Sequence, residues 1–171
     1  METQRWKKYF ASFLHSAAED EGIFISLTQH LFHLIAKDIR NWHVTVHFPL
    51  GVNVAAGHLM NESFTNDVMS FHEKLSASII LVVEITERSL IDDPKVASEK
   101  LDEIRHKGCK VAVDDFGTGY CSLSLLQSLP LDYLKIDKSF IDTLTSARAD
   151  TPVLDTIVNL SKRLGLITVA E

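Results

Sequence analysis

The feature that most constrains this fold is an alternation of short β-rich runs with longer amphipathic stretches. Five runs are rich in β-branched and aromatic residues: 43–54 (HVTVHFPLGVNV), 79–86 (IILVVEIT), 110–116 (KVAVDDF), 133–137 (YLKID) and 167–171 (ITVAE). Most are continuously apolar over several residues, which is the pattern of strands buried on both faces. Strands that alternate with helices through short connections predict right-handed crossovers and a parallel sheet.

Helix signals lie between these runs. Asp93-Pro94 and Thr151-Pro152 each offer an N-cap residue followed by proline at the first helical position. Gly108 and Gly165 stand where a helix would end before the next strand. A further helix is predicted over residues 26–41, and its apolar face carries Leu27, Leu31, Leu34 and Ile35.

Each β-rich run also ends in polar residues that a buried strand has no need to carry. In a (β/α) barrel the carboxyl ends of the parallel strands meet at one mouth, and active sites lie there. In an open doubly wound sheet these ends spread along a row, and only those at a switch point share a ligand. The pattern therefore favours a TIM-like α/β barrel. The strand-end residues, in order, are Asn53, Glu84, Asp114 with Asp115, Lys135 with Asp137, and Glu171.

The residue types at these ends indicate a metal site. Carboxylate and amide oxygens without histidine or thiolate neighbours suit Mg²⁺ or Mn²⁺ better than zinc. Asp114 and Asp115 would point to opposite sides of a regular strand, but at the strand end, before Gly117, both would reach a metal. Two metals bridged by a carboxylate would clamp a phosphodiester and activate a water for in-line attack. Lys135 would orient that water or offset charge on the phosphate.

Taken singly, the same residues have ordinary structural explanations. It is their occurrence at successive strand ends that favours a functional interpretation. The structural alternatives are a turn cap at Asn53 or Asp115, a solvated pair of Glu84 and Glu87 beside Arg88, and an ion pair of Lys135 with Asp137.

Composition narrows the classes of function. The chain has 171 residues, enough for one domain with a sizeable core, and 46% of them are apolar. Its net charge of −6 argues against broad attraction to DNA, RNA or anionic lipid. Cys109 and Cys121 match no zinc spacing, which favours a reducing, cytoplasmic setting. No run approaches the ~20 apolar residues of a membrane span, and no signal peptide is expected, although a membrane-anchored parent protein stays open.

Several short motifs then match a known family. The run at 114–123, DDFGTGYCSL, is very close to the DDFGTGYSSL signature of EAL domains, and the chain resembles that family from about residue 16 to its end. We therefore expect residues 16–171 to form a partial EAL domain and residues 1–15 a divergent N-terminal segment. The other matching motifs, in the family's order, are GVNVA at 51–55, EITE at 84–87, LKID at 134–137 and VAE at 169–171.

The resemblance implies a TIM-like barrel that binds cyclic di-GMP and hydrolyses it to linear pGpG with two Mg²⁺ or Mn²⁺ ions. The residues that would bind the nucleotide itself stay unassigned, and a homodimer is an open expectation. By position, the resemblance makes Asn53, Glu84, Asp114 and Asp115 metal ligands, and it makes Lys135, Glu171 and Asp137 the catalytic or supporting residues.

The chain departs from the family pattern at two places, and these departures leave an alternative function open. No Glu-Ala-Leu triplet occurs in the chain, and the sequence ends at Glu171 within the family's AEGVE motif. About five of the eight strands of a complete barrel are expected here. The alternative function is therefore a catalytically inactive EAL-like body that binds cyclic di-GMP or a protein partner.

Overall fold

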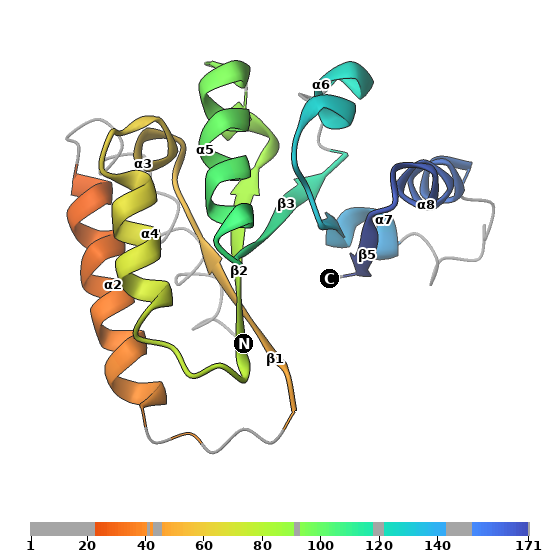
Figure 1. The fold of residues 1–171 in the computed structure, drawn as a ribbon. Coiled ribbons are helices and arrows are strands. Elements are labelled where there is room, and N and C mark those ends of the chain that lie inside the picture. The colour runs from red at the N-terminus through yellow and green to blue at the C-terminus, as the bar shows by residue number, and fades with distance from the viewer. Residues whose placement is uncertain are drawn as a thin grey trace, which may run out of the picture.

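In the computed structural model of the chain, residues 23–40, 42, 46–90, 93–117, 122–142 and 152–170 are described. Helices and strands alternate along these residues (Figure 1). In chain order they are α2 (Ile23–Ile39), β1 (Phe48–Asn53), α3 (Ala56–Met60), α4 (Phe64–His72), β2 (Ile79–Thr86), the 3₁₀ helix η1 (Glu87–Leu90), α5 (Pro94–His106), β3 (Lys110–Phe116), α6 (Leu123–Ser128), β4 (Tyr133–Ile136), α7 (Lys138–Asp142), α8 (Pro152–Leu164) and β5 (Ile167–Ala170).

The five described strands form one sheet in the order β1-β2-β3-β4-β5, and every neighbouring pair is parallel. Strand order that follows chain order is the arrangement of a (β/α) barrel, because right-handed crossovers then place successive helices on the same side. A doubly wound sheet instead reverses its strand order at a switch point. The fold is therefore a half-barrel of five parallel strands, which confirms the predicted α/β class and TIM-like architecture.

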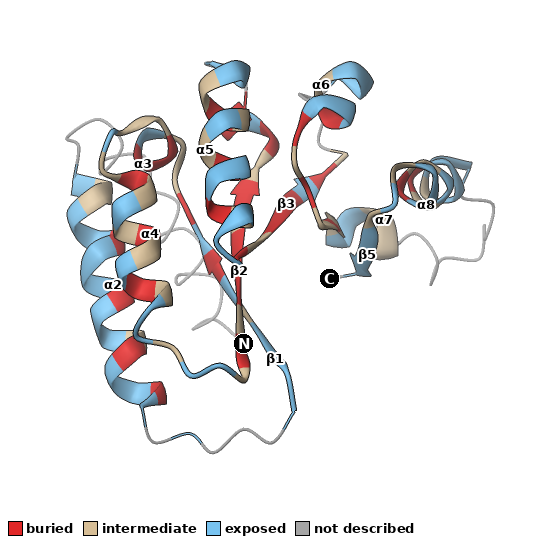
Figure 2. Ribbon diagram, in the orientation of Figure 1, coloured by how far each residue is buried: buried red, intermediate tan, exposed pale blue. Residues whose placement is uncertain are grey.

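The core lies between the central strands and the helices that cover them. Figure 1 shows α2, α4 and α5 running alongside one another, and in Figure 2 the buried residues gather on β2, β3 and the helix faces turned toward them. Phe64, Phe71, Leu101 and Ile104 are at most 1% exposed. Each such side chain contributes about 1.5–3 kcal/mol by leaving water, so this face holds the central strands in place.

The predicted helix ends are largely confirmed. Asp93 caps α5, and its side chain accepts hydrogen bonds from the backbone N–H groups of Lys95 and Val96 at 3.2 and 3.1 Å. Gly108 and Gly165 follow α5 and α8 with φ of 101° and 70°, a left-handed conformation that favours glycine. Helix α8 begins at Pro152 as predicted, and the expected cap Thr151 lies outside the described residues.

Two predictions at the N-terminal side need correction. Of the strand expected over 43–54, β1 covers Phe48–Asn53, residues 46, 47 and 54 are not part of it, and residues 43–45 lie outside the described residues. Pro49 lies within β1 and is tolerated there because β1 is an edge of the described sheet. The helix over 26–41 is present as α2, but most of its predicted apolar face is turned outward: Leu27, Leu31 and Leu34 are 52, 44 and 41% exposed. Of the predicted face, Ile35 is half-buried and packs against the core. The packed face of α2 instead carries Thr28, Phe32, Ala36 and Ile39, whose two small residues allow close helix contact.

The amino-terminal ends of β3 and β4 are joined by one carboxylate. Asp132, just before β4, accepts hydrogen bonds from Arg105 Nε at 2.9 Å, Lys110 Nζ at 2.9 Å and the backbone N–H of Val111 at 3.0 Å. Burial alone would raise the pKa of Asp132, but these three donors outweigh it and lower the pKa below the usual value. This end of the sheet is therefore tied together by ionic hydrogen bonds, opposite the end that carries the site.

No helix within the described ranges is long and apolar enough to cross a bilayer.

Candidate metal and catalytic site

Two carboxylates and an ammonium group meet at the carboxyl end of the sheet. Lys135 Nζ, from β4, donates to Glu84 Oε2 on β2 at 2.8 Å and to Asp114 Oδ2 on β3 at 3.0 Å. The three side chains are only 11–15% exposed. Three of the predicted site residues, widely separated in sequence, are therefore in direct contact.

The strand register explains why these side chains share one face. Glu84 pairs with Asn53 on one side and with Ala112 on the other, so Asp114 lies two residues further along β3 on the same face. Val113 pairs with Leu134, which places Lys135 beside Asp114. Because side chains alternate along a strand, the residues that flank these three point to the opposite, helix-covered face. The flanking residues Val83, Ile85, Val113 and Leu134 are fully buried.

A bulge in β3 changes that alternation at the aspartate pair. Val113 pairs with Leu134 and Phe116 with Ile136, so β3 advances three residues while β4 advances two. Asp115 has φ of 53°, and its backbone N–H donates to Asp114 Oδ1 at 2.9 Å. Phe116 returns to the buried side, and both aspartates lie between it and Val113. A bulge of this kind re-aims side chains, and it lifts the strict up-and-down constraint expected for adjacent strand residues.

The other predicted site residues lie around this cluster. Asn53 is the last residue of β1, pairs with Glu84 and is exposed. Asp115 is exposed beside the buried Asp114. Asp137 follows β4 and caps α7, where its Oδ1 accepts from the backbone N–H of Ser139 at 2.8 Å and from the Ser139 hydroxyl. Glu171 lies outside the described residues.

Glu87 is a residue whose role the sequence did not single out. A solvated pair with Glu84 beside Arg88 was one expectation, but Glu87 is 3% exposed. Its Oε1 accepts a hydrogen bond from the backbone N–H of Gly117 at 3.0 Å, directly after β3. A buried carboxylate thus holds the start of the loop that follows Asp114 and Asp115. The signal in the sequence was its place in EITE, three residues beyond Glu84.

The donor set fits a hard divalent cation. The carboxylates of Glu84 and Asp114 both bind the Lys135 ammonium. The amide of Asn53, which pairs with Glu84, and the carboxylate of Asp115, which follows Asp114, add further oxygen donors next to them. All of these donors are oxygens, the ligands that Mg²⁺ and Mn²⁺ prefer. Within the described ranges no three His, Cys, Asp or Glu side chains are grouped as metal ligands, and the two inner carboxylates, Glu84 and Asp114, share the ammonium group of Lys135.

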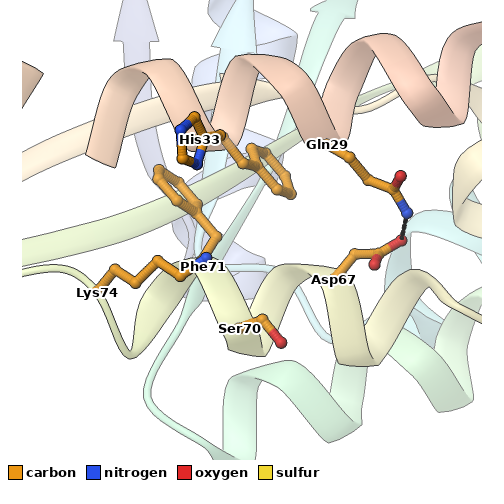
Figure 3. A pocket seen from close by; sticks show the side chains of 7 residues that line it. Gln29, His33, Asp67, Ser70, Phe71 and Lys74 are labelled. Carbon is orange, nitrogen blue, oxygen red and sulfur yellow. Dashed lines mark hydrogen bonds between the residues drawn. The ribbon is translucent and has the colours of Figure 1, made fainter. Parts of the chain in front are cut away.

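A separate surface pocket lies on the helix side, between α2 and α4 (Figure 3). Its Phe32 and Phe71 rings stack at 4.5 Å, and at one end Gln29 Nε2 donates to Asp67 Oδ2 at 3.0 Å. These contacts join two helices, and none of the predicted site residues lines the pocket, so we assign it no part in the chemistry. The lining residues are Gln29, Phe32, His33, Asp67, Ser70, Phe71 and Lys74.

Comparison with known proteins finds similar sequences that are named as cyclic di-GMP phosphodiesterases. It is 40% identical over 157 residues to the probable cyclic di-GMP phosphodiesterase PdeN of Escherichia coli K12, a match that covers 90% of this chain and 30% of PdeN. It is 33% identical over 157 residues to the cyclic di-GMP phosphodiesterase PdeL of the same organism, covering 90% of this chain and 43% of PdeL. The chain thus spans less than half the length of these relatives.

The fold is likewise similar to solved structures. The PaMucR phosphodiesterase in complex with c-di-GMP superposes with a TM-score of 0.81 and 27% identity, over 93% of this chain and 70% of that one. The family model for the EAL domain matches residues 3–171, whereas the boundary expected after residue 15 stays a prediction. With a match over nearly the whole sequence and the site motifs at one end of a parallel half-barrel, this chain belongs to the EAL domain family.

Proposed function

We propose that this chain carries the site of a metal-dependent phosphodiesterase that hydrolyses cyclic di-GMP to linear pGpG. The proposal rests on one observation: the carboxylates of Glu84 and Asp114, from neighbouring strands, both bind the ammonium group of Lys135 at the carboxyl end of the sheet. Relatives named as cyclic di-GMP phosphodiesterases support the choice of substrate.

In this proposal Asn53, Glu84, Asp114 and Asp115 hold two Mg²⁺ or Mn²⁺ ions. Such ions, when bound, offset the charge of the phosphodiester and lower the pKa of a water for in-line attack. The bulge at Asp115 supplies a second aspartate without lengthening the strand. Glu87, by accepting from the backbone N–H of Gly117, would fix the chain directly after β3, close to Asp114 and Asp115.

Lys135 has two tasks in the proposed site. Its ammonium keeps Glu84 and Asp114 together, since two carboxylates so close would otherwise repel. During hydrolysis the same group would orient the attacking water and stabilise negative charge on the phosphate. Asp137, as the cap of α7, would fix the segment that follows Lys135, and Glu171 would help activate the water.

The wider setting is also proposed. Cyclic di-GMP is the expected partner, and a net charge of −6 gives no reason to expect binding to DNA or RNA polymers. Buried Cys109, a free thiol, is consistent with a reducing cytoplasm. A homodimer of the chain is a further expectation that an oligomeric-state measurement would decide.

The alternative is an EAL-like body that binds cyclic di-GMP or a protein without cleaving it. It rests on the missing Glu-Ala-Leu triplet. It is the less favoured candidate, because a body freed from catalysis would have no need to retain the matched metal ligands Asn53, Glu84, Asp114 and Asp115.

The decisive experiment measures release of pGpG from cyclic di-GMP with Mg²⁺ or Mn²⁺, beside binding in Ca²⁺. Asp114→Asn should lower turnover at least about 100-fold by removing a metal ligand. Asp155→Asn, an exposed position on α8, is the matched control and should behave as the unaltered chain. Binding in Ca²⁺ without product would support the non-catalytic alternative, and unchanged turnover by Asp114→Asn would refute the assignment of the metal ligands.

A further inference from the structure

We infer that Gly51 is a positioning residue for the metal site, and that the space left by its missing side chain sets where the Glu84 carboxylate lies. The inference rests on the metal site proposed above. Gly51 lies in β1, two residues before Asn53, and is the first residue of the GVNVA motif.

In the observed geometry the Glu84 carboxylate occupies the place that a side chain at position 51 would take. A Cβ atom built on Gly51 would lie 2.2 Å from Glu84 Oε1 and 2.9 Å from Glu84 Cδ. Gly51 pairs with Val82, and Glu84 is two residues further along β2 on the same face. The Glu84 carboxylate therefore extends over the β1 backbone, in the volume that any other residue would fill.

The second oxygen of the same carboxylate is fixed from the other side. Glu84 Oε2 accepts from Lys135 Nζ at 2.8 Å, and Lys135 is also bound to Asp114. Glu84 is thus held between a bare stretch of backbone and an ammonium group. A methyl group at position 51 would push Oε1 away from β1 and change the separation between Glu84 and its neighbours Asn53 and Asp114.

This displacement should affect the site and spare the fold. The atoms that meet the new Cβ are the far end of a flexible side chain, and they can move without disturbing the backbone. Gly51 is exposed and has no left-handed φ, so alanine fits its backbone conformation. Residues that orient metal ligands typically change metal affinity by about 10–100-fold when they are altered.

The test is Mn²⁺ binding to the full chain by isothermal titration calorimetry, with the melting temperature measured alongside. We expect Gly51→Ala to weaken binding about tenfold while the melting temperature stays unchanged. Gly57→Ala is the control, because a Cβ at Gly57 meets nothing within 4 Å. Glu84→Asp supplies a second background, since its shorter side chain withdraws the carboxylate from Gly51. In the Glu84→Asp background, Gly51→Ala should weaken Mn²⁺ binding by less than about threefold.

The outcomes separate this inference from the proposal beneath it. If Gly51→Ala binds Mn²⁺ as the unaltered chain does, or weakens binding equally in both backgrounds, then Gly51 does not act through Glu84. A Gly51→Ala substitution that simply disrupted folding would weaken Mn²⁺ binding equally in both backgrounds and would also lower the melting temperature. If Glu84→Ala binds Mn²⁺ as tightly as the unaltered chain, or the unaltered chain binds none, the proposed metal site itself is wrong.

Discussion

At the scale of single residues, the site is organised around Lys135. Its ammonium satisfies Glu84 and Asp114, which lie on neighbouring strands and are 15 and 11% exposed. The Lys135 ammonium is a candidate catalytic group, and it also stabilises the fold by binding both carboxylates. The two roles can be tested separately, because the stabilising role does not require substrate.

Replacing Lys135 by methionine should destabilise the metal-free protein by about 2–3 kcal/mol, because two partly buried carboxylates lose their shared donor. Mg²⁺ should then raise the melting temperature more in Lys135→Met than in the unaltered chain, since the ion no longer competes with an ammonium. Differential scanning fluorimetry with and without Mg²⁺ measures both effects, with exposed Lys162→Met as the control. If Mg²⁺ raised the melting temperature equally in both proteins, the ion and the Lys135 ammonium would not compete for Glu84 and Asp114.

Asp115 is held in a left-handed conformation with φ of 53°, which disfavours any residue with a Cβ atom. Asp115→Gly and Asp115→Ala both remove the carboxylate, but only glycine relieves the backbone. We expect the glycine variant to be more stable than the alanine variant by about 1 kcal/mol, measured by urea unfolding, while both lose Mn²⁺ affinity. Equal stabilities would show that the bulge imposes no strain.

At the scale of elements, Asp132 joins α5, β3 and β4 at the end of the sheet away from the site. Its lowered pKa means that folding favours the ionised form. The resulting stability is fully present above the unfolded pKa of about 3.9 and is lost as pH falls through the lower folded pKa.

Asp132→Asn should therefore destabilise the protein by about 2 kcal/mol at pH 7, and the difference from the unaltered chain should shrink below about pH 4. Urea unfolding at a series of pH values measures this, and Asp38→Asn on the exposed side of α2 is the comparison. A difference that stays constant down to pH 2 would show that the ionised carboxylate is not what Arg105 and Lys110 hold.

At the scale of the whole molecule, Cys109 reports whether the half-barrel is a cooperative unit. It lies directly before β3, is 1% exposed, and burial raises the pKa of its thiol to about 11. In a Cys121→Ser background, alkylation at pH 8 should be slow and should accelerate with urea in step with global unfolding followed by circular dichroism. Modification at the rate of a free thiol without urea would mean that β3 opens independently.

The extent of agreement between sequence and structure differs from element to element. The runs at 79–86 and 110–116 match β2 and β3 residue for residue, because central strands are apolar on both faces and end at polar residues. The run at 43–54 extends beyond β1, whose edge position and Pro49 weaken the pattern. In α2 the sequence shows two apolar faces, and periodicity alone does not say which one meets α3 and α4.

The sequence by itself determined the alternation of strands and helices, the placement of acids, an amide and a lysine at strand ends, and the resemblance to EAL domains. These are local properties, set by side-chain period, helix caps and residue type. Only the tertiary structure decided that Lys135 binds Glu84 and Asp114 together, that Glu87 is buried against Gly117, and that Gly51 leaves space for a carboxylate. Those contacts depend on strand register and on one bulge, which bring together residues that are up to 51 positions apart in the chain.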